Sequence, residues 1–339
     1  MVILKLSMLE TKNQNFNHLK IHTQYSICEG TIKIEDLKNF CKEHKIQSVG
    51  LSDTSNLCGA LEFAENISKV GTQPIIGTQI NFKFEDTVGL IPLIALNSIG
   101  YKNIVELSSK SYLENGDNII PTLELDMLYG KPEGMLIMSG SINGLFGKLF
   151  DKGRFDEISN IYNKLSKAYK DKFYIEIQRH NDHNEKLFEK FNLQQSLKLK
   201  IPIIATNETF YLDKNMYEAH DALLCIGSKT YINEKNRLKY SSNHYFKTNE
   251  EMQKLFSDLP EALENNYNLP YLCSYRPQST NPVLPNISSD KGGDADKILL
   301  KDSETGLKNK FLKIFKIDEI NLVKNEKFIR YKKRLDHEL

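Results

Sequence analysis

Three polar residues that could take part in metal chemistry alternate along one short stretch near the N-terminus. His18, Lys20 and His22 are separated by apolar residues in the segment FNHLKIHTQYSICEG, residues 16–30. A β-strand points successive side chains to opposite faces, so the three polar residues would share one face. A His-x-His pair on a strand can direct two imidazoles at one metal ion. Here the residue two before His22 is Lys20, whose ammonium group cannot be a ligand at neutral pH. The stretch therefore predicts a strand that leads into an incomplete metal site.

Length and composition limit the classes of protein to which the chain can belong. Its 339 residues suffice for one large domain, or for one large and one small domain. The 45 basic and 44 acidic residues give no overall positive field, so any contact with DNA must be local. The five cysteines form no C-x-x-C pair, which favours reduced thiols. Because no apolar run approaches the ~20 residues of a membrane span, we expect a soluble, cytoplasmic protein that starts at Met1 or Met8.

The hydrophobic pattern alternates between segments of strand length and segments of helix length. After the opening strand, the predicted strands are 47–52, 73–82, 90–97, 135–140, 173–178 and 201–206. Such repeats imply a parallel sheet covered by helices, either doubly wound or closed into a barrel. Polar residues that follow the strands are His22, Asp53, Thr54, Gln79, Ser141, 178–180 and 206–210. Because so many strand ends contribute to one centre, we favour a barrel.

Beyond Tyr211 the pattern changes to helices, predicted at 216–227, 250–256 and 260–269. Residues 276–296 are rich in Pro, Asn, Ser and Gly, which predicts an extended connection. We interpret Asp294 and Asp296 as capping residues of the next helix rather than as magnesium ligands. The final residues, IRYKKRLDHEL, continue a helical pattern without a C-cap, so we expect a chain cut inside a second domain.

Eight segments, in this order, resemble the N-terminal polymerase-and-histidinol-phosphatase (PHP) domain of the bacterial DNA polymerase III alpha subunit. They are HLKIHTQYSICEG, LSDTSNLCGALEF, PIIGTQI, IMSGSINGLFG, YIEIQRH, IIATNETFYL, EAHDALLCIG and FSDLPEALEN. The NLCG block is most similar to that of proteobacterial members. The resemblance implies an α/β fold, a distorted (βα)7 TIM-like barrel with C-terminal helices at 16–285, after an N-terminal extension at 1–15. Residues 286–339 resemble the linker and the incomplete, mostly helical start of the palm domain.

The resemblance also implies nine metal-ligand positions, of which five carry residues that bind metal ions poorly. Lys20, Thr54, Gln79, Ser141 and Phe210 stand where active family members have His, His, Glu, Cys and His. His22 and His180 are kept, and Glu29 and Glu208 replace aspartates. We interpret the site as metal-free and noncatalytic, with Lys20 in the place of a cation and paired with Glu29 or Glu208.

Two functions follow from the resemblance. In the first, the chain is a noncatalytic scaffold of the replicative polymerase that supports the polymerase domain and docks the proofreading exonuclease. Sliding clamp, clamp-loader tau and DNA would bind the C-terminal part, and magnesium would serve the full-length polymerase. The palm carboxylates are expected further along, so we assign no catalytic residue and no cofactor to this chain. In the second, it is a metal-dependent phosphoesterase or 3'-5' exonuclease that holds Zn or Mn through His22, Glu29, His180 and Glu208.

Other polar residues are predicted to have structural roles. We expect His18 to form a hydrogen bond within the barrel mouth and Asp53 to accept hydrogen bonds at a turn between a strand and a helix. His220 and Asp221 lie in a predicted helix and are interpreted as packing and surface residues. The histidines expected to be solvated are His44, His183, His244 and His337.

Overall fold

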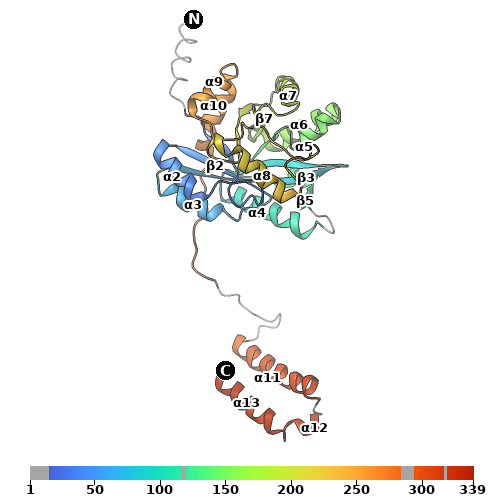
Figure 1. The fold of residues 1–339 in the computed structure, drawn as a ribbon. Coiled ribbons are helices and arrows are strands. Elements are labelled where there is room, and N and C mark those ends of the chain that lie inside the picture. The colour runs from blue at the N-terminus through green and yellow to red at the C-terminus, as the bar shows by residue number, and fades with distance from the viewer. Residues whose placement is uncertain (1–14, 116–119, 284–293, 317–318) are drawn as a thin grey trace. The chain divides into compact units, whose positions relative to one another are not determined.

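The computed structural model describes residues 15–115, 120–283, 294–316 and 319–339. Contacts within the chain divide it into two units, Met1–Ser279 and Thr280–Leu339 (Figure 1). The predicted N-terminal extension, apart from Asn15, lies outside the described residues, and so does 284–293 of the predicted connection. The identity of the second unit as the start of a palm domain stays a prediction.

The larger unit is built on a nine-stranded sheet in the order β8-β7-β6-β4-β3-β2-β1-β9, with β5 paired to β3. The strands are β1 (His18–Ile21), β2 (Ser48–Thr54), β3 (Gln73–Phe84), β4 (Thr87–Ala95), β5 (Thr122–Glu124), β6 (Met135–Met138), β7 (Phe173–Ile177), β8 (Ile203–Ala205) and β9 (Glu208–Thr209). The strands at the two ends of this order, β8 and β9, are joined by Thr206 and Asn207 alone. The sheet therefore curls back on itself, and the predicted distorted TIM-like barrel is confirmed.

The sheet is mixed, whereas the sequence predicted parallel strands throughout. β3 and β4 form an antiparallel hairpin in which Phe84 pairs with Thr87, and β4 is also antiparallel to β6. Glu85 in the turn has φ 53°, the left-handed conformation that tight hairpins use. The parallel arrangement predicted for the strands at 73–82 and 90–97 was wrong, because a parallel crossover needs about a dozen residues or more and only residues 85 and 86 separate β3 from β4. The intervening residues are too few.

Helices surround the curled sheet (Figure 1). They are α2 (Ile34–His44), α3 (Ala60–Ser68), α4 (Ser98–Leu113), α5 (Leu145–Asp151), α6 (Phe155–Tyr169), α7 (Glu185–Leu199), α8 (Tyr217–Ser228), α9 (Asn249–Leu255) and α10 (Pro260–Asn268). The three helices predicted beyond Tyr211 are confirmed as α8, α9 and α10. Ile34, Leu37 and Phe63 show how α2 and α3 hold to the sheet, since all three are fully buried in a common apolar cluster.

The smaller unit is helical in its described part. Its helices are α11 (Ala295–Ile314), α12 (Glu319–Leu322) and α13 (Glu326–Glu338). Phe311 of α11 is buried and packs against Phe328 and Tyr331 of α13, with ring centroids 5.3 and 5.4 Å apart. Asp294 is the N-cap of α11 and its side chain accepts a hydrogen bond of 3.2 Å from the backbone N–H of Asp296, which confirms the capping interpretation. Over the described ranges, no helix combines the length and apolar character needed to cross a membrane.

Candidate functional site

The ammonium group of Lys20 lies between two buried carboxylates inside the barrel. Its Nζ is 3.3 Å from Glu176 Oε1 and 3.4 Å from Glu208 Oε1. β1 and β9 pair in parallel with Lys20 opposite Glu208, while Glu176 comes from β7. Burial disfavours the charge of Lys20, but attraction by Glu176 and Glu208 outweighs burial and raises the lysine pKa. A positive charge is therefore held among the predicted ligand positions.

Glu208 is the residue on which the predicted site residues converge. Its Oε1 atom lies 3.0 Å from His22 Nε2 and accepts a hydrogen bond of 2.6 Å from Gln79 Nε2. Burial opposes ionisation, but attraction by Lys20 and the hydrogen bonds with His22 and Gln79 hold the pKa of Glu208 well below its usual range. Phe210 stacks on His22 with ring centroids 4.4 Å apart. These five residues therefore form one packed group around an ionised carboxylate.

Glu176 is a site residue that sequence reasoning missed. It accepts a hydrogen bond of 2.7 Å from Gln178 Nε2 and another from Thr206 Oγ1. The sequence carried a signal, because a carboxylate within the apolar run FYIEI would be buried and would then need a buried partner. The likeness to a family drew attention to the family's ligand positions, and Glu176 is not one of them.

Of the two partners expected for Lys20, Glu208 pairs with it and Glu29 does not. The Oε2 atom of Glu29 accepts a hydrogen bond of 2.5 Å from Thr54 Oγ1. Glu29 lies in the turn after β1, where its backbone carbonyl also contacts His220 Nε2 at 2.8 Å. Two of the nine predicted positions therefore form a separate pair at the rim of the barrel.

His180 and His244 stack face to face beside Glu208. Their ring centroids are 4.0 Å apart and their planes differ by 4°. His180 Nε2 accepts a hydrogen bond of 3.2 Å from the backbone N–H of Glu208, and its Nδ1 lies 3.2 Å from Glu185 Oε1. The nitrogens of His244 lie 3.1 Å from the carbonyl oxygen of Glu208 and 3.1 Å from Asp182 Oδ2.

The expectation that His244 is solvated was wrong, since it is 1% exposed. The chain after α8 folds back onto the barrel, where the carbonyl of His244 accepts a hydrogen bond of 3.0 Å from the backbone N–H of Phe210. Tyr240 of the same segment stacks on Phe210, with ring centroids 4.8 Å apart. A polar sequence between two helices gave no sign of this return. The segment covers the side chains that the strand ends present.

His180, Asp182 and His244 bring three possible ligand atoms within 4.8 Å of one another. This group fits a metal ion poorly, because an imidazole lone pair lies in the plane of its ring. Parallel stacked rings hold their lone pairs in two parallel planes that do not meet, so the lone pairs cannot both point straight at one ion. All four ring nitrogens also have polar partners already. A resident ion would have to break these contacts.

Ser141 lies beside the Lys20 centre, at a cavity that it lines together with Glu176, Gln178 and Glu185. The cavity volume is about 10 Å³, which is about the space that one water molecule needs. A phosphate group or nucleotide therefore has no room beside Glu176 in this conformation.

The family model of the PHP domain matches residues 18–180. The chain contains a PHP domain. Two curated relatives are both named DNA polymerase III subunit alpha. That of Caulobacter vibrioides is 32% identical over 345 residues, which cover 98% of this chain and 29% of the relative. That of Rickettsia conorii is 34% identical over 326 residues, which cover 96% of this chain and 28% of the relative. The chain thus spans less than a third of the length of these relatives.

Solved structures give a weaker likeness. A two-domain protein from Bacteroides vulgatus, described as containing a predicted PHP-like metal-dependent phosphoesterase, is 11% identical with a TM-score of 0.36. The match covers 71% of this chain and 62% of that protein. So low a TM-score supports no conclusion about the site.

Asp53 and His18, two residues of the PHP domain outside the nine positions, form hydrogen bonds as predicted, but His18 is the first residue of β1 and does not lie at the strand end expected to form the barrel mouth. Asp53 accepts hydrogen bonds of 2.7 Å from the backbone N–H of Thr23 and from Ser26 Oγ. His18 Nε2 lies 2.9 Å from the carbonyl oxygen of Lys247, and burial lowers the pKa of His18 to about 3.

The remaining predicted residues also have structural partners. His220 is buried, in agreement with a packing role. Asp221 is a buried residue as well, and forms hydrogen bonds of 2.6 and 2.7 Å with Arg237. It was expected at the surface, but a guanidinium group brought over by the segment after α8 pairs with it. His44, His183 and His337 are exposed, as predicted.

Proposed function

We propose that the chain is the PHP-containing region of a cytoplasmic DNA polymerase III alpha subunit and that its barrel is a noncatalytic scaffold. The barrel would support the polymerase domain and dock the proofreading exonuclease. One observation carries the proposal: the ammonium group of Lys20 lies within 3.4 Å of carboxylate oxygens of both Glu176 and Glu208. The named relatives support the assignment to the alpha subunit. Template-directed synthesis with magnesium, and contacts with clamp, clamp loader and DNA, belong in this proposal to the complete subunit.

The electrostatics favour a lysine-filled site over a metal site. Glu176 and Glu208 are the anionic groups that a divalent cation would need, and both are already paired with Lys20. A dication placed between them would lie close to the ammonium group in a region of low dielectric, where like charges repel strongly. We infer that no resident metal ion binds, and that the lysine supplies the positive charge on which the packing of the carboxylates depends.

Metal content tests this inference directly. After dialysis against chelator and then buffer, we expect elemental analysis to find far less than one Zn or Mn ion per chain. Added Mn should leave the melting temperature unchanged, because binding to the folded state alone would raise it. Lys38→Met, which removes a lysine from the surface, serves as the matched control for Lys20→Met in the same assay. A stoichiometric ion retained by the unaltered chain would refute the metal-free site.

Docking of the exonuclease needs its own experiment. The chain, immobilised through a C-terminal tag, should retain the purified exonuclease subunit at micromolar concentration, and an unrelated protein on the same matrix should not. Lys20→Ala should weaken retention only to the extent that it unfolds the barrel, as measured by circular dichroism. A complex with a binding free energy of about −7 kcal/mol is detectable at ~10 μM. Absence of binding at that concentration would count against a docking role.

The hydrolytic alternative has less support. His22, Glu29, His180 and Glu208 were its candidate ligands, but Glu29 lies in a separate pair with Thr54. The cavity beside Glu176 is water-sized. Release of phosphate or nucleotides on addition of Mn, abolished by His22→Ala, would restore this alternative and displace the scaffold proposal.

A further inference from the structure

The cavity of about 10 Å³ beside Glu176 is lined by residues of β7, of α7 and of the segment that follows β6. All of its lining residues except Ser141 and Glu189 are buried. Two of the buried residues, Glu176 and Asn192, carry polar side chains and are 2% and 0% exposed. A molecule in this cavity would therefore be surrounded mainly by protein.

The two carboxylate oxygens of Glu176 have different surroundings. Oε1 accepts hydrogen bonds from Gln178 and Thr206 and lies 3.3 Å from Lys20 Nζ. Oε2 is buried and has no hydrogen-bond partner among the described residues. A buried acceptor without a partner loses the hydration that it has in the unfolded chain, which costs free energy. Oε2 is thus an acceptor that a donor in the cavity would satisfy.

Asn192 of α7 provides the complementary group. Its Oδ1 atom accepts a hydrogen bond of 3.1 Å from the hydroxyl of Tyr162. Burial raises the pKa of Tyr162, so the phenol is protonated at neutral pH and can donate this bond. The amide nitrogen Nδ2 remains, and it is buried without a hydrogen-bond partner in the described part of the chain. Asn192 therefore offers N–H donors where Glu176 offers an acceptor.

We propose that one water molecule binds in this cavity, donating a hydrogen bond to Glu176 Oε2 and accepting one from Asn192 Nδ2. The volume is about that needed by a single water, and water can donate to one group while it accepts from the other. A metal ion or an ammonium ion would face the N–H groups of Asn192. An anion would face the carboxylate of Glu176. The two side chains together therefore select a small neutral molecule.

The bound water would connect the ion pair of Lys20 and Glu176 to the helices around the barrel. Lys20 of β1 lies at one oxygen of Glu176, and the water would lie at the other. From the water the path continues through Asn192 of α7 to Tyr162 of α6. The water thus acts as a positioning group for the Glu176 carboxylate. The proposal rests on this geometry and is independent of the assignment to a polymerase subunit.

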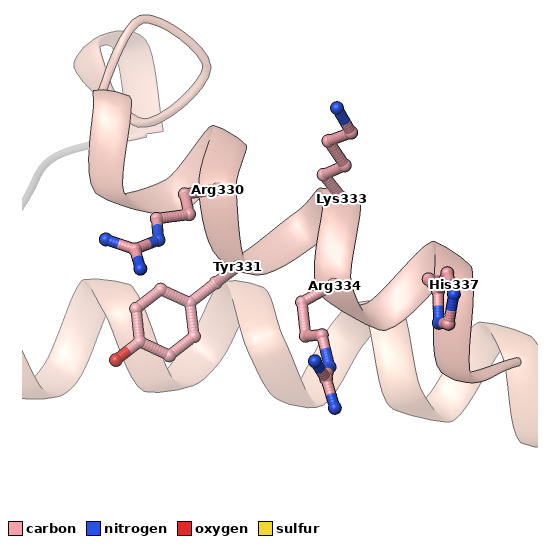
Figure 2. A pocket seen from close by; sticks show the side chains of 5 residues that line it. All are labelled: Arg330, Tyr331, Lys333, Arg334 and His337. Carbon is pink, nitrogen blue, oxygen red and sulfur yellow. The ribbon is translucent and has the colours of Figure 1, made fainter.

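Size alone does not define a binding site, as the hollow along α13 illustrates. That hollow measures about 630 Å³ and is lined by Arg330, Tyr331, Lys333, Arg334 and His337 (Figure 2). All five residues are exposed, so bulk water solvates them and no particular ligand is required. In the small cavity, by contrast, burial keeps bulk water from Glu176 Oε2 and Asn192 Nδ2.

A crystal structure of the whole chain, at a resolution that shows ordered waters, tests the site directly. We expect one peak of density in the cavity, about 2.7–3.2 Å from both Glu176 Oε2 and Asn192 Nδ2, which is the range of hydrogen bonds. A peak about 2.0–2.6 Å from the carboxylate, the range for magnesium and calcium, would identify a metal ion and overturn the proposal. A cavity without density would overturn it as well.

Magnetic relaxation dispersion of water oxygen-17 tests the same site in solution, because it counts long-lived buried waters. Asn192→Leu removes the donor at similar side-chain size and should lower the count by one. Asn66→Leu is the matched control, since the Asn66 side chain donates to the carbonyl of Glu62 within its own helix, and it should leave the count unchanged.

Circular dichroism verifies that both variants fold. An unchanged count in folded Asn192→Leu, or an equal loss in the control, would contradict the proposal. If Asn192→Leu does not fold, the crystal structure of the unaltered chain decides between the two outcomes.

Discussion

Under the scaffold proposal, the ammonium group of Lys20 takes the place of a metal cation, and the side chains around it suit a single fixed positive charge. A lysine brings one positive charge, whereas Glu176 and Glu208 bring two negative charges. Amide groups add hydrogen bonds, from Gln79 to Glu208 and from Gln178 to Glu176, while Glu176 Oε2 has no hydrogen-bond partner among the described residues. A glutamate at position 79 would add a third buried carboxylate. The glutamine thus suits the lysine, and the altered positions are best understood together.

Removal of the buried ammonium group should destabilise the barrel severely. Lys20→Met keeps most of the side-chain volume but leaves Glu176 and Glu208 buried without their cation. Breaking a buried ion pair in this way typically costs about 3–5 kcal/mol of unfolding free energy. Urea denaturation at neutral pH measures the loss. Lys38→Met, which removes a partly exposed pair with Glu35, should cost less than ~1 kcal/mol. Equal stability of the two variants would contradict an electrostatic role for Lys20.

The site residues that could be predicted from the sequence are those at the ligand positions of the family pattern. Lys20, His22, Gln79 and Glu208 were found because they stand at positions of a family pattern, and their convergence followed from the ends of neighbouring strands. Glu176 was missed because it is not one of the family's ligand positions, although it lies within a strand as Lys20 and Gln79 do.

Asp182 and His244 were missed for a different reason. They come from loops, and no periodicity predicts how a loop returns to the barrel. His244 is brought to the site by the segment after α8, far from the first strand in sequence. Contacts between residues of separate loops and strand ends, such as those of His244, become evident only from the three-dimensional structure.

At the scale of elements, Asp53 ties the end of β2 to the turn after β1. It accepts hydrogen bonds from the backbone N–H and Oγ1 of Thr23, each 2.7 Å, and from Ser26 Oγ. Ser26 in turn contacts His22 Nδ1 at 3.1 Å. The carboxylate therefore holds two strand ends in register and fixes the position of the imidazole next to Glu208.

Loss of this link should loosen the turn after β1. Asp53→Ala leaves three buried donors without an acceptor, and we expect a loss of about 2–4 kcal/mol in unfolding free energy. Asp53→Asn keeps one carbonyl acceptor, so its unfolding free energy should lie between those of the unaltered chain and Asp53→Ala. Hydrogen exchange would show faster exchange of the backbone amides of Thr23 and its neighbours. The exposed Asp126→Ala should change stability by less than ~0.5 kcal/mol, and a comparable loss there would argue against the link.

Elements were predictable where periodicity and length agreed, and not otherwise. α8, α9 and α10 were located from their helical patterns to within a few residues. The hairpin of β3 and β4 was not predicted. Both strands contain runs of successive apolar residues, and such a run does not show whether two strands are parallel or antiparallel. Their short separation was the available signal. Closure of the sheet could not be derived locally, because β8 and β9 lie at opposite ends of a path that runs through six other strands.

At the scale of the whole molecule, buried neutral histidines make the fold sensitive to acid. Burial is the main cause that lowers the pKa of His18 to about 3 and that of His180 well below its usual range. In the unfolded chain both would titrate near ~6.5. Below that pH the unfolded state binds more protons than the folded state, so stability falls on acidification. Glu208 adds to the loss at lower pH, because the stabilisation from its depressed pKa is complete only above ~4.3, its unfolded value, and declines progressively below that pH.

His18→Phe should reduce this acid sensitivity in a measurable way. Each proton taken up on unfolding contributes a slope of up to about 1.4 kcal/mol per pH unit. Between pH ~4 and ~6, where an unfolded His18 is protonated and the folded one is not, the slope of unfolding free energy against pH should fall by about that amount. Phenylalanine can keep the ring contacts with Phe16 and Phe246, and the lost hydrogen bond to the carbonyl of Lys247 changes stability equally at each pH. His183→Gln, at an exposed position, should leave the slope unchanged; an unchanged slope in His18→Phe would mean that His18 is not held neutral by burial.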